Sequence, residues 1–163
     1  MIVVSDTSPL NYLVLIDLQH ILPELFERIL IPSAVRDELQ SARAPEAIAR
    51  FMAAAPAWLE TRQVSEVDPK LQHLDRGERE AITLAASLSV GSVLIDERKG
   101  RLVARERGLA VSGTLGGRAR PRRTSWTGGL LGRVTAFGKH DLPGISQIDG
   151  SHQREVSVNL GWP

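Results

Sequence analysis

The 163-residue sequence contains no cysteine, which excludes disulfides, thiolate metal sites and cysteine nucleophiles together. It also lacks an apolar run of the roughly 18 residues that a membrane-spanning helix requires. Its N-terminus enters a strand pattern directly, without the basic and apolar leader of a secreted protein. We therefore expect neither secretion nor membrane insertion, and the absence of cysteine favours the cytoplasm.

The sequence has little net charge of either sign. The formal charge is +1: residues 1–116 carry 13 Lys and Arg against 16 Asp and Glu, and residues 117–163 carry 7 against 3. A charge this small gives no general attraction to nucleic acid, so RNA or DNA binding must depend on local patches. The hydrophobic content of 42% and the charged content of 24% are those of an ordinary globular domain.

Short apolar segments alternate with helical patterns in the first 116 residues. Strands are predicted over residues 2–5, 28–31, 58–64, 92–95 and 109–112, and helices over residues 8–18, 22–27, 33–40, 45–55, 77–90 and 98–107. Pro32 is predicted at a helix N1 position, Asp75 as a helix cap, and Gly91 as a helix end. The alternation predicts an α/β fold with a mainly parallel central sheet.

Acidic residues recur where predicted strands end or helices begin. Parallel sheets bind ligands at the carboxyl ends of their strands, where two of these acids fall. Carboxylates gathered there repel one another unless a cation neutralises them, and they are ligands that Mg²⁺ and Mn²⁺ prefer. The pattern predicts a metal site. The acidic residues are Asp6, Glu38, Glu78, Glu80, Asp96 and Glu97.

Each acid also has a purely structural interpretation when it is considered alone. Asp6 is placed to cap the helix that follows it, and Glu38 has the pattern of a solvated helix residue. Glu78 and Glu80 suit the first turn of a helix, where the macrodipole favours negative charge. Only the joint order of the acids along the chain favours a functional site over these interpretations.

Five ordered motifs closely resemble those of PIN-domain proteins, and specifically the VapC-like subgroup. The resemblance covers residues 1–116. The motifs are Asp6-Thr7-Ser8-Pro9-Leu10, Ile31-Pro32 with Val35 and Glu38, Leu74-Asp75-Arg76-Gly77-Glu78 with Ala81-Ile82, Leu94-Ile95-Asp96-Glu97-Arg98-Lys99-Gly100-Arg101, and Gly113-Thr114-Leu115-Gly116.

The resemblance implies a three-layer α/β/α fold and a ribonuclease that hydrolyses phosphodiesters with Mg²⁺ or Mn²⁺. It also implies an RNA substrate, a homodimer, and the role of the toxin in a toxin–antitoxin pair with a small antitoxin protein. An alternative is a catalytically degenerate PIN-like protein that binds RNA or a partner without cleavage.

The motifs also imply roles for particular acids. Glu80 stays open as an alternative to Glu78, because its distance from Gly91 also suits the PIN pattern, although the two glutamates lie about 200° apart on a helix. Glu97 stands where many relatives carry a second Asp, and it is a further candidate metal ligand. The catalytic and metal-binding acids implied by the resemblance are Asp6, Glu38, Glu78 and Asp96.

Neighbouring residues receive supporting roles from the same resemblance. Thr7 would orient Asp6 or hold a water bound to the metal. Arg98, Lys99 and Arg101 directly follow the last acidic motif, where they are placed to contact RNA phosphates.

Residues 117–163 depart from the resemblance and form an atypical C-terminal segment, which we expect to be poorly ordered. This segment holds eight of the 14 glycines and an arginine-rich run over residues 118–123. One hypothesis is a shifted reading frame or a substituted C-terminus; another is a flexible arm that binds nucleic acid. In either case the core would lack its closing helices and expose apolar surface of the sheet or of the helix over residues 81–88.

Overall fold

The computed structural model describes residues 1–114. The predictions about the C-terminal segment, including the arginine-rich arm and the boundary at residue 116, lie outside these residues. Among residues 1–114, no helix combines the length and the apolar character that crossing a membrane requires.

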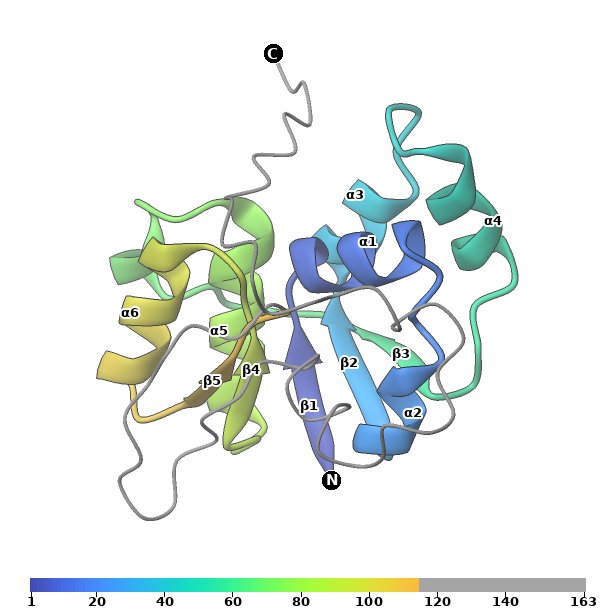
Figure 1. Cartoon of the computed structure of the whole chain (residues 1–163). Helices are drawn as coiled ribbons and strands as arrows, with labels where there is room; N and C mark the ends of the chain where they lie inside the picture. Colours follow the sequence, from blue (N-terminus) through green and yellow to red (C-terminus); the bar gives the residue numbers. More distant parts are fainter. Residues whose placement is uncertain (115–163) are drawn as a thin grey trace, which may run out of the picture.

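One parallel sheet forms the centre of the molecule (Figure 1). Its strands lie in the order β3-β2-β1-β4-β5, and every neighbouring pair is parallel. The strands are β1 (Ile2–Ser5), β2 (Arg28–Pro32), β3 (Leu59–Arg62), β4 (Ser92–Leu94) and β5 (Ala110–Ser112). The predicted α/β fold with a parallel sheet is confirmed.

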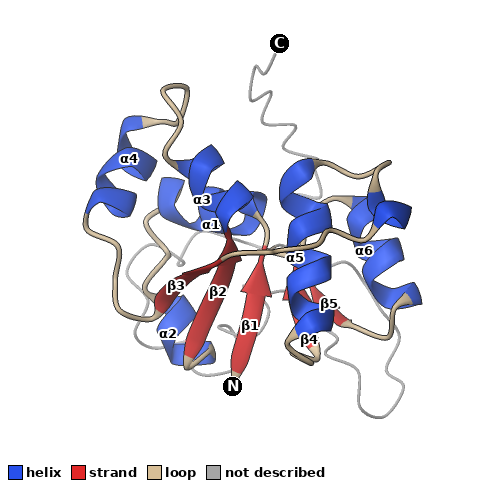
Figure 2. Ribbon diagram, turned by 180° about the vertical axis from the view of Figure 1, so that it is seen from behind, coloured by secondary structure: helices blue, strands red, loops and turns tan. Residues whose placement is uncertain are grey.

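Helices connect successive strands and cover the sheet (Figure 2). They are α1 (Thr7–Leu15), α2 (Ile21–Leu25), α3 (Ser33–Leu39), α4 (Glu46–Ala53), α5 (Arg76–Ser87) and α6 (Arg98–Glu106), with a short 3₁₀ helix at Pro69–Leu71. Each predicted helix is present, with ends that differ by a few residues. The 3₁₀ helix was not predicted; Asp68 caps it through a hydrogen bond from the Lys70 N–H.

Alternating side chains of the strands build two separate cores. Val3 and Leu94 point to the face that packs against α1, α2, α3 and α4. Their chain neighbours Val4 and Val93 point to the opposite face, against α5 and α6. This period of two residues places one helical layer on each side of the sheet and gives the three-layer α/β/α architecture.

Two predictions about helix ends were wrong. Pro32 is the last residue of β2 and the N-cap of α3, not its first helical residue. Helix α5 ends at Ser87, before the predicted end at Gly91, and Ser89 adopts a left-handed conformation (φ 54°). In contrast, Asp75 caps α5 as predicted, in a capping box with Glu78.

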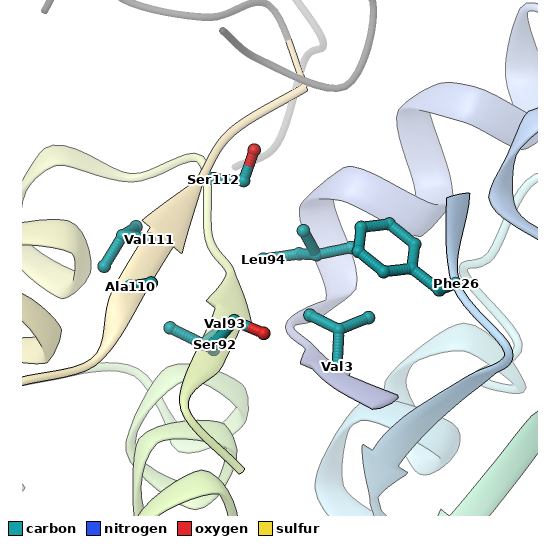
Figure 3. Close-up of a pocket in the computed structure, with 8 residues that line it drawn as sticks. All are labelled: Val3, Phe26, Ser92, Val93, Leu94, Ala110, Val111 and Ser112. Carbon is teal, nitrogen blue, oxygen red and sulfur yellow. The ribbon is translucent and has the colours of Figure 1, made fainter. Parts of the chain in front are cut away.

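An apolar depression lies on one face of the sheet beside β4 and β5 (Figure 3). Val3, Leu94 and Phe26 line it together with residues of β5. Among residues 1–114, no carboxylate or basic side chain lines it, and these lining residues offer no ligand for a metal ion.

Candidate metal centre

The sheet brings the ends of β1 and β4 together. The chain passes from β1 to β2 on one side, while β4 pairs with the other side of β1, so the strand order reverses between β1 and β4. The Asp6 N–H donates to the Leu94 carbonyl at 3.0 Å, and Asp96 follows two residues after Leu94. Asp6 and Asp96 therefore lie at the position where open α/β sheets bind ligands.

Asp6 is the most strongly perturbed acid at this position. It is the N-cap residue of α1, but its side chain makes no capping hydrogen bond, and it is only 5% exposed. The pKa of Asp6 is raised to about 7, chiefly by burial and also by the charges of Glu78, Glu38 and Asp96, while the Thr7 backbone N–H opposes the rise. Glu78, Glu38 and Asp96 thus lie close enough to Asp6 to disfavour its charged form.

Glu38 approaches Asp6 from the C-terminal half of α3. Its side chain is exposed, and its Oε2 accepts a hydrogen bond from Thr7 Oγ1 at 2.6 Å. Thr7 therefore orients Glu38, and the predicted roles of orienting Asp6 or holding a water bound to the metal stay predictions. Helix α5 packs against Asp6 as well, because a Cβ atom at Gly77 would lie 2.8 Å from Asp6 Oδ1. Glycine is required there because the α5 backbone packs directly against this carboxylate.

Glu78 is buried beside the same cluster, with 3% of its surface exposed. Its Oε2 accepts from the Asp75 N–H at 3.4 Å, whereas its Oε1 has no hydrogen-bond partner within residues 1–114. The pKa of Glu78 is raised to about 7, chiefly by burial and also by the charge of Glu97. The Asp75 N–H and the Lys99 ammonium oppose this rise.

Glu78 also belongs to a second group of carboxylates. Oxygen atoms of Asp75, Glu78 and Glu97 all lie within 4.8 Å of one another. Asp75 and Glu97 are exposed and are the N-cap residues of α5 and α6. From the sequence, Asp75 was predicted only as a helix cap. The local pattern of a helix cap does not show that Glu97, at the start of another helix, lies close to it.

Asp96 is held by Thr114, a residue to which the sequence gave no separate role. The Thr114 N–H donates to Asp96 Oδ1 and its Oγ1 donates to Asp96 Oδ2, each at 2.6 Å. Thr114 is 1% exposed. The Arg101 guanidinium also donates to the Asp96 carbonyl. These bonds fix the position of the carboxylate after β4. The Gly113-Thr114 motif was the feature of the sequence that could have indicated this role of Thr114.

We predict that Thr114→Val lowers Mn²⁺ affinity by about 10- to 100-fold, the usual range for a group that orients a metal ligand. Valine has nearly the same shape but leaves Asp96 Oδ2 without its donor. Calorimetric titration checks this loss, and Thr114→Ser, which keeps the hydroxyl, is expected to restore the affinity. Equal affinities for the valine and serine variants would show that the hydroxyl does not position Asp96.

The structure separates Glu80 from the cluster. Its Oε2 accepts from the Ala34 N–H in the first turn of α3, and its Oε1 accepts from Arg76 Nε, both at 3.1 Å. Glu80 thereby satisfies an N–H that α3 leaves free at its N-terminus. The geometry assigns Glu80 to joining α5 with α3, and it is Glu78 that lies beside Asp6.

The predicted RNA-binding residues divide into two kinds. Arg98 and Lys99 are exposed in the first turn of α6, and neither forms a salt bridge within residues 1–114. Lys99 lies close enough to Glu78 to lower the pKa of that carboxyl. Arg101 is half-buried and engaged with the Asp96 backbone. Arg98 and Lys99 are therefore the cations available to a phosphate, whereas Arg101 supports the site from within.

The residues of the cluster fit a divalent cation. All are hard oxygen donors, which suit Mg²⁺ and Mn²⁺. Glu78 Oε1 is a buried atom without a partner within residues 1–114, and such an atom is costly unless a ligand satisfies it. Asp6 and Glu78 both have pKa values raised to about 7, and a cation would relieve this by favouring their charged forms.

A parallel sheet between two helical layers, with a carboxylate cluster where the strand order reverses, defines a nuclease-type α/β domain. The chain belongs to the PIN-domain family, because a family model described as a PIN domain matches residues 2–116. The predicted membership of this family is thereby confirmed, whereas the VapC-like subgroup stays a prediction.

The fold is similar to that of a solved PilT N-terminus domain protein from the hyperthermophilic archaeon Sulfolobus solfataricus P2. The TM-score is 0.53 and the sequence identity is 19%, with 69% of this chain and 87% of that chain covered. At this identity the similarity supports the fold alone. Comparison with curated proteins gives no match.

Proposed function

We propose that the protein is a metal-dependent ribonuclease that hydrolyses phosphodiester bonds with Mg²⁺ or Mn²⁺. The observation that carries the proposal is the buried Asp6 carboxylate, whose pKa is raised to about 7 in the company of Glu38, Glu78 and Asp96. Concentrating negative charge in this way is unfavourable for folding, and a bound cation explains it. These four acids are the proposed ligands, with Glu97 as a further ligand on the Glu78 side.

The remaining residues of the site have complementary roles. When bound, Mg²⁺ or Mn²⁺ supplies Lewis-acid chemistry that lowers the pKa of water and offsets charge on the phosphoryl oxygens. The hydroxyls of Thr7 and Thr114 are committed to Glu38 and Asp96, and we assign the nucleophile to water and not to a side chain. Arg98 and Lys99 attract the flanking RNA phosphates.

We further propose, from the resemblance to VapC-like proteins, that the protein is the toxin of a toxin–antitoxin pair. A small antitoxin protein would then cover the acidic cluster, and the toxin would act as a homodimer in the cytoplasm. A short reading frame beside the coding sequence, whose product co-purifies with this protein, is the observation that would support this pairing.

Cleavage of end-labelled RNA tests the proposed activity. The wild-type protein is expected to cleave RNA in Mn²⁺ and to stop when EDTA is added. Glu38→Gln is expected to reduce cleavage by more than about 100-fold, because a direct ligand matters more than the groups that orient it. Glu38 is exposed, so this variant should fold normally.

Glu80→Gln is the matched control. It changes a glutamate in the same way, but at a carboxylate bonded to α3 and Arg76, so it should lower the melting temperature and leave cleavage intact. Folded wild-type protein that neither binds Mn²⁺ nor cleaves RNA would refute the proposal. Binding of Mn²⁺ and RNA without cleavage would instead support the catalytically degenerate alternative.

A further inference from the structure

A hollow opens directly beside the carboxylate cluster, between the N-terminal end of α1, the C-terminal end of α3 and the start of α4. These three helices lie together at the carboxyl edge of the sheet (Figure 1). The hollow has a cavity volume of about 90 Å³, several times the roughly 10–15 Å³ that one water molecule needs, so it has room for a small chemical group. Thr7 and Glu38 line the wall that it shares with the cluster.

Two polar side chains that line this hollow make no hydrogen bond that would stabilise residues 1–114. Ser8 and Asn11, on the first turns of α1, make no side-chain hydrogen bond within residues 1–114. Thr7, beside them, is committed to Glu38. An asparagine amide offers two donors and an acceptor that can pair with the edge of a planar ring. Such groups in a partly enclosed site are available for a ligand.

The rest of the lining is apolar. Leu39 and Ile48 are buried at the base of the hollow, and Pro45 lies at its exposed rim. An apolar surface opposite an amide and a hydroxyl matches a ligand with apolar faces and polar edges. An apolar side chain of a protein partner would fill the same space but would leave Ser8 and Asn11 without partners, which is unfavourable.

The charged residues near the hollow indicate which part of a ligand would lie inside it. The Glu38 carboxylate on the wall disfavours a phosphate inside the hollow. Arg43 lies in the connection between α3 and α4, exposed and without a salt bridge within residues 1–114. It is adjacent in sequence to Ala44, which lines the hollow. The arrangement suits a neutral ring inside and a phosphate near Arg43 outside.

We propose that this hollow receives one unpaired nucleobase of the RNA, next to the phosphate held at the carboxylate cluster, and that Asn11 and Ser8 contact the edge of that base. This inference rests on the proposed ribonuclease function and adds a site that selects the base. It makes cleavage depend on sequence, whereas a metal centre alone recognises only the backbone.

Binding of short RNA tests the proposal without cleavage. Labelled hexamers of adenosine, cytidine and uridine are compared with an abasic hexamer by fluorescence anisotropy, with Ca²⁺ in place of Mn²⁺. The wild type is expected to bind at least one base-bearing hexamer about tenfold more tightly than the abasic one, since a good side-chain contact to a base gives about tenfold discrimination or more. Asn11→Leu should abolish that preference and leave Mn²⁺ affinity unchanged.

Ser8→Ala should weaken the preference in the same direction. Ser87→Ala is its matched control, because Ser87 lies on α5 and its hydroxyl bonds only to the Leu84 carbonyl within residues 1–114. Melting temperatures establish that each variant folds. If Asn11→Leu does not fold, Asn11→Asp is used in its place.

Equal binding of base-bearing and abasic hexamers by the wild type would overturn the proposed base-binding site. Cleavage of RNA in Mn²⁺ by the same protein would still support the proposed ribonuclease function. Self-association that Asn11→Leu abolishes, with unchanged RNA binding, would assign the hollow to a second copy of the chain and likewise overturn the proposal. Absence of RNA binding by folded protein would overturn it as well, and Mn²⁺ titration with the cleavage assay then decides whether the nuclease function fails too.

Discussion

Asp6→Asn is expected to make the metal-free protein more stable above pH 7 and, at the same time, to abolish its stabilisation by Mn²⁺ and its cleavage of RNA. Opposite effects on stability and function are expected because the wild-type carboxylate is buried among three others and has a pKa of about 7. Asparagine removes the charge and nearly preserves the shape.

The direction of the pH dependence follows from proton binding. The ordinary pKa of an aspartic acid side chain is 3.8, whereas that of Asp6 in the folded protein is about 7. Between these values the folded protein binds more protons than the unfolded chain. Stability therefore falls as pH rises from about 4 to about 7, and it remains low above that range. The shift corresponds to a contribution on the order of 4 kcal/mol, and Glu78 acts in the same direction.

Thermal unfolding between pH 5 and pH 8, in EDTA and in Mn²⁺, measures these effects. The wild type should lose stability with rising pH in EDTA and regain it in Mn²⁺, whereas Asp6→Asn should show a weaker pH dependence and no response to Mn²⁺. Asp17→Asn is the matched control, because Asp17 is exposed beyond the end of α1 and asparagine tolerates its positive φ of 57°. A destabilised Asp6→Asn at pH 8 would contradict the proposed charge repulsion.

Gly100→Ala is expected to destabilise the protein and to weaken Mn²⁺ binding together. A Cβ atom at Gly100 would lie 2.9 Å from Glu78 Cδ and 2.9 Å from Ile95 Cγ2, and closer still to Glu78 Oε1. Ile95 is fully buried, so it has little room to move. Overpacking of this kind costs about 1–3 kcal/mol, which exceeds the small gain in helix propensity from alanine in the first turn of α6.

Gly91→Ala provides the comparison. No atom lies within 4 Å of a Cβ atom at Gly91, and its φ is not positive, so this variant should be neutral or more stable by about 0.4–1 kcal/mol. Denaturant unfolding and Mn²⁺ titration of both variants measure the difference. Wild-type stability and Mn²⁺ affinity of Gly100→Ala would contradict this prediction. Such a result would show that the Glu78 carboxylate moves aside freely and is not held in a fixed position.

The fold could be predicted from the sequence to a large extent. Apolar runs and helical periodicity located the strands and helices because both signals are local and depend on which side chains face the core. The positions of Asp6 and Asp96 after their strands also indicated a shared edge. The C-terminal end of α5 was less predictable: the helix ends at Ser87, and Ser89, not a glycine, adopts the left-handed conformation.

The sequence by itself determined that carboxylates gather at one edge of a parallel sheet. Only the tertiary structure placed Glu78 beside Asp6 and Glu80 against the α3 backbone, because residues two apart on α5 point to different neighbours. It also paired Thr114 with Asp96. Such contacts join residues distant along the chain, so their partners are fixed by how helices pack on the sheet and not by any local pattern.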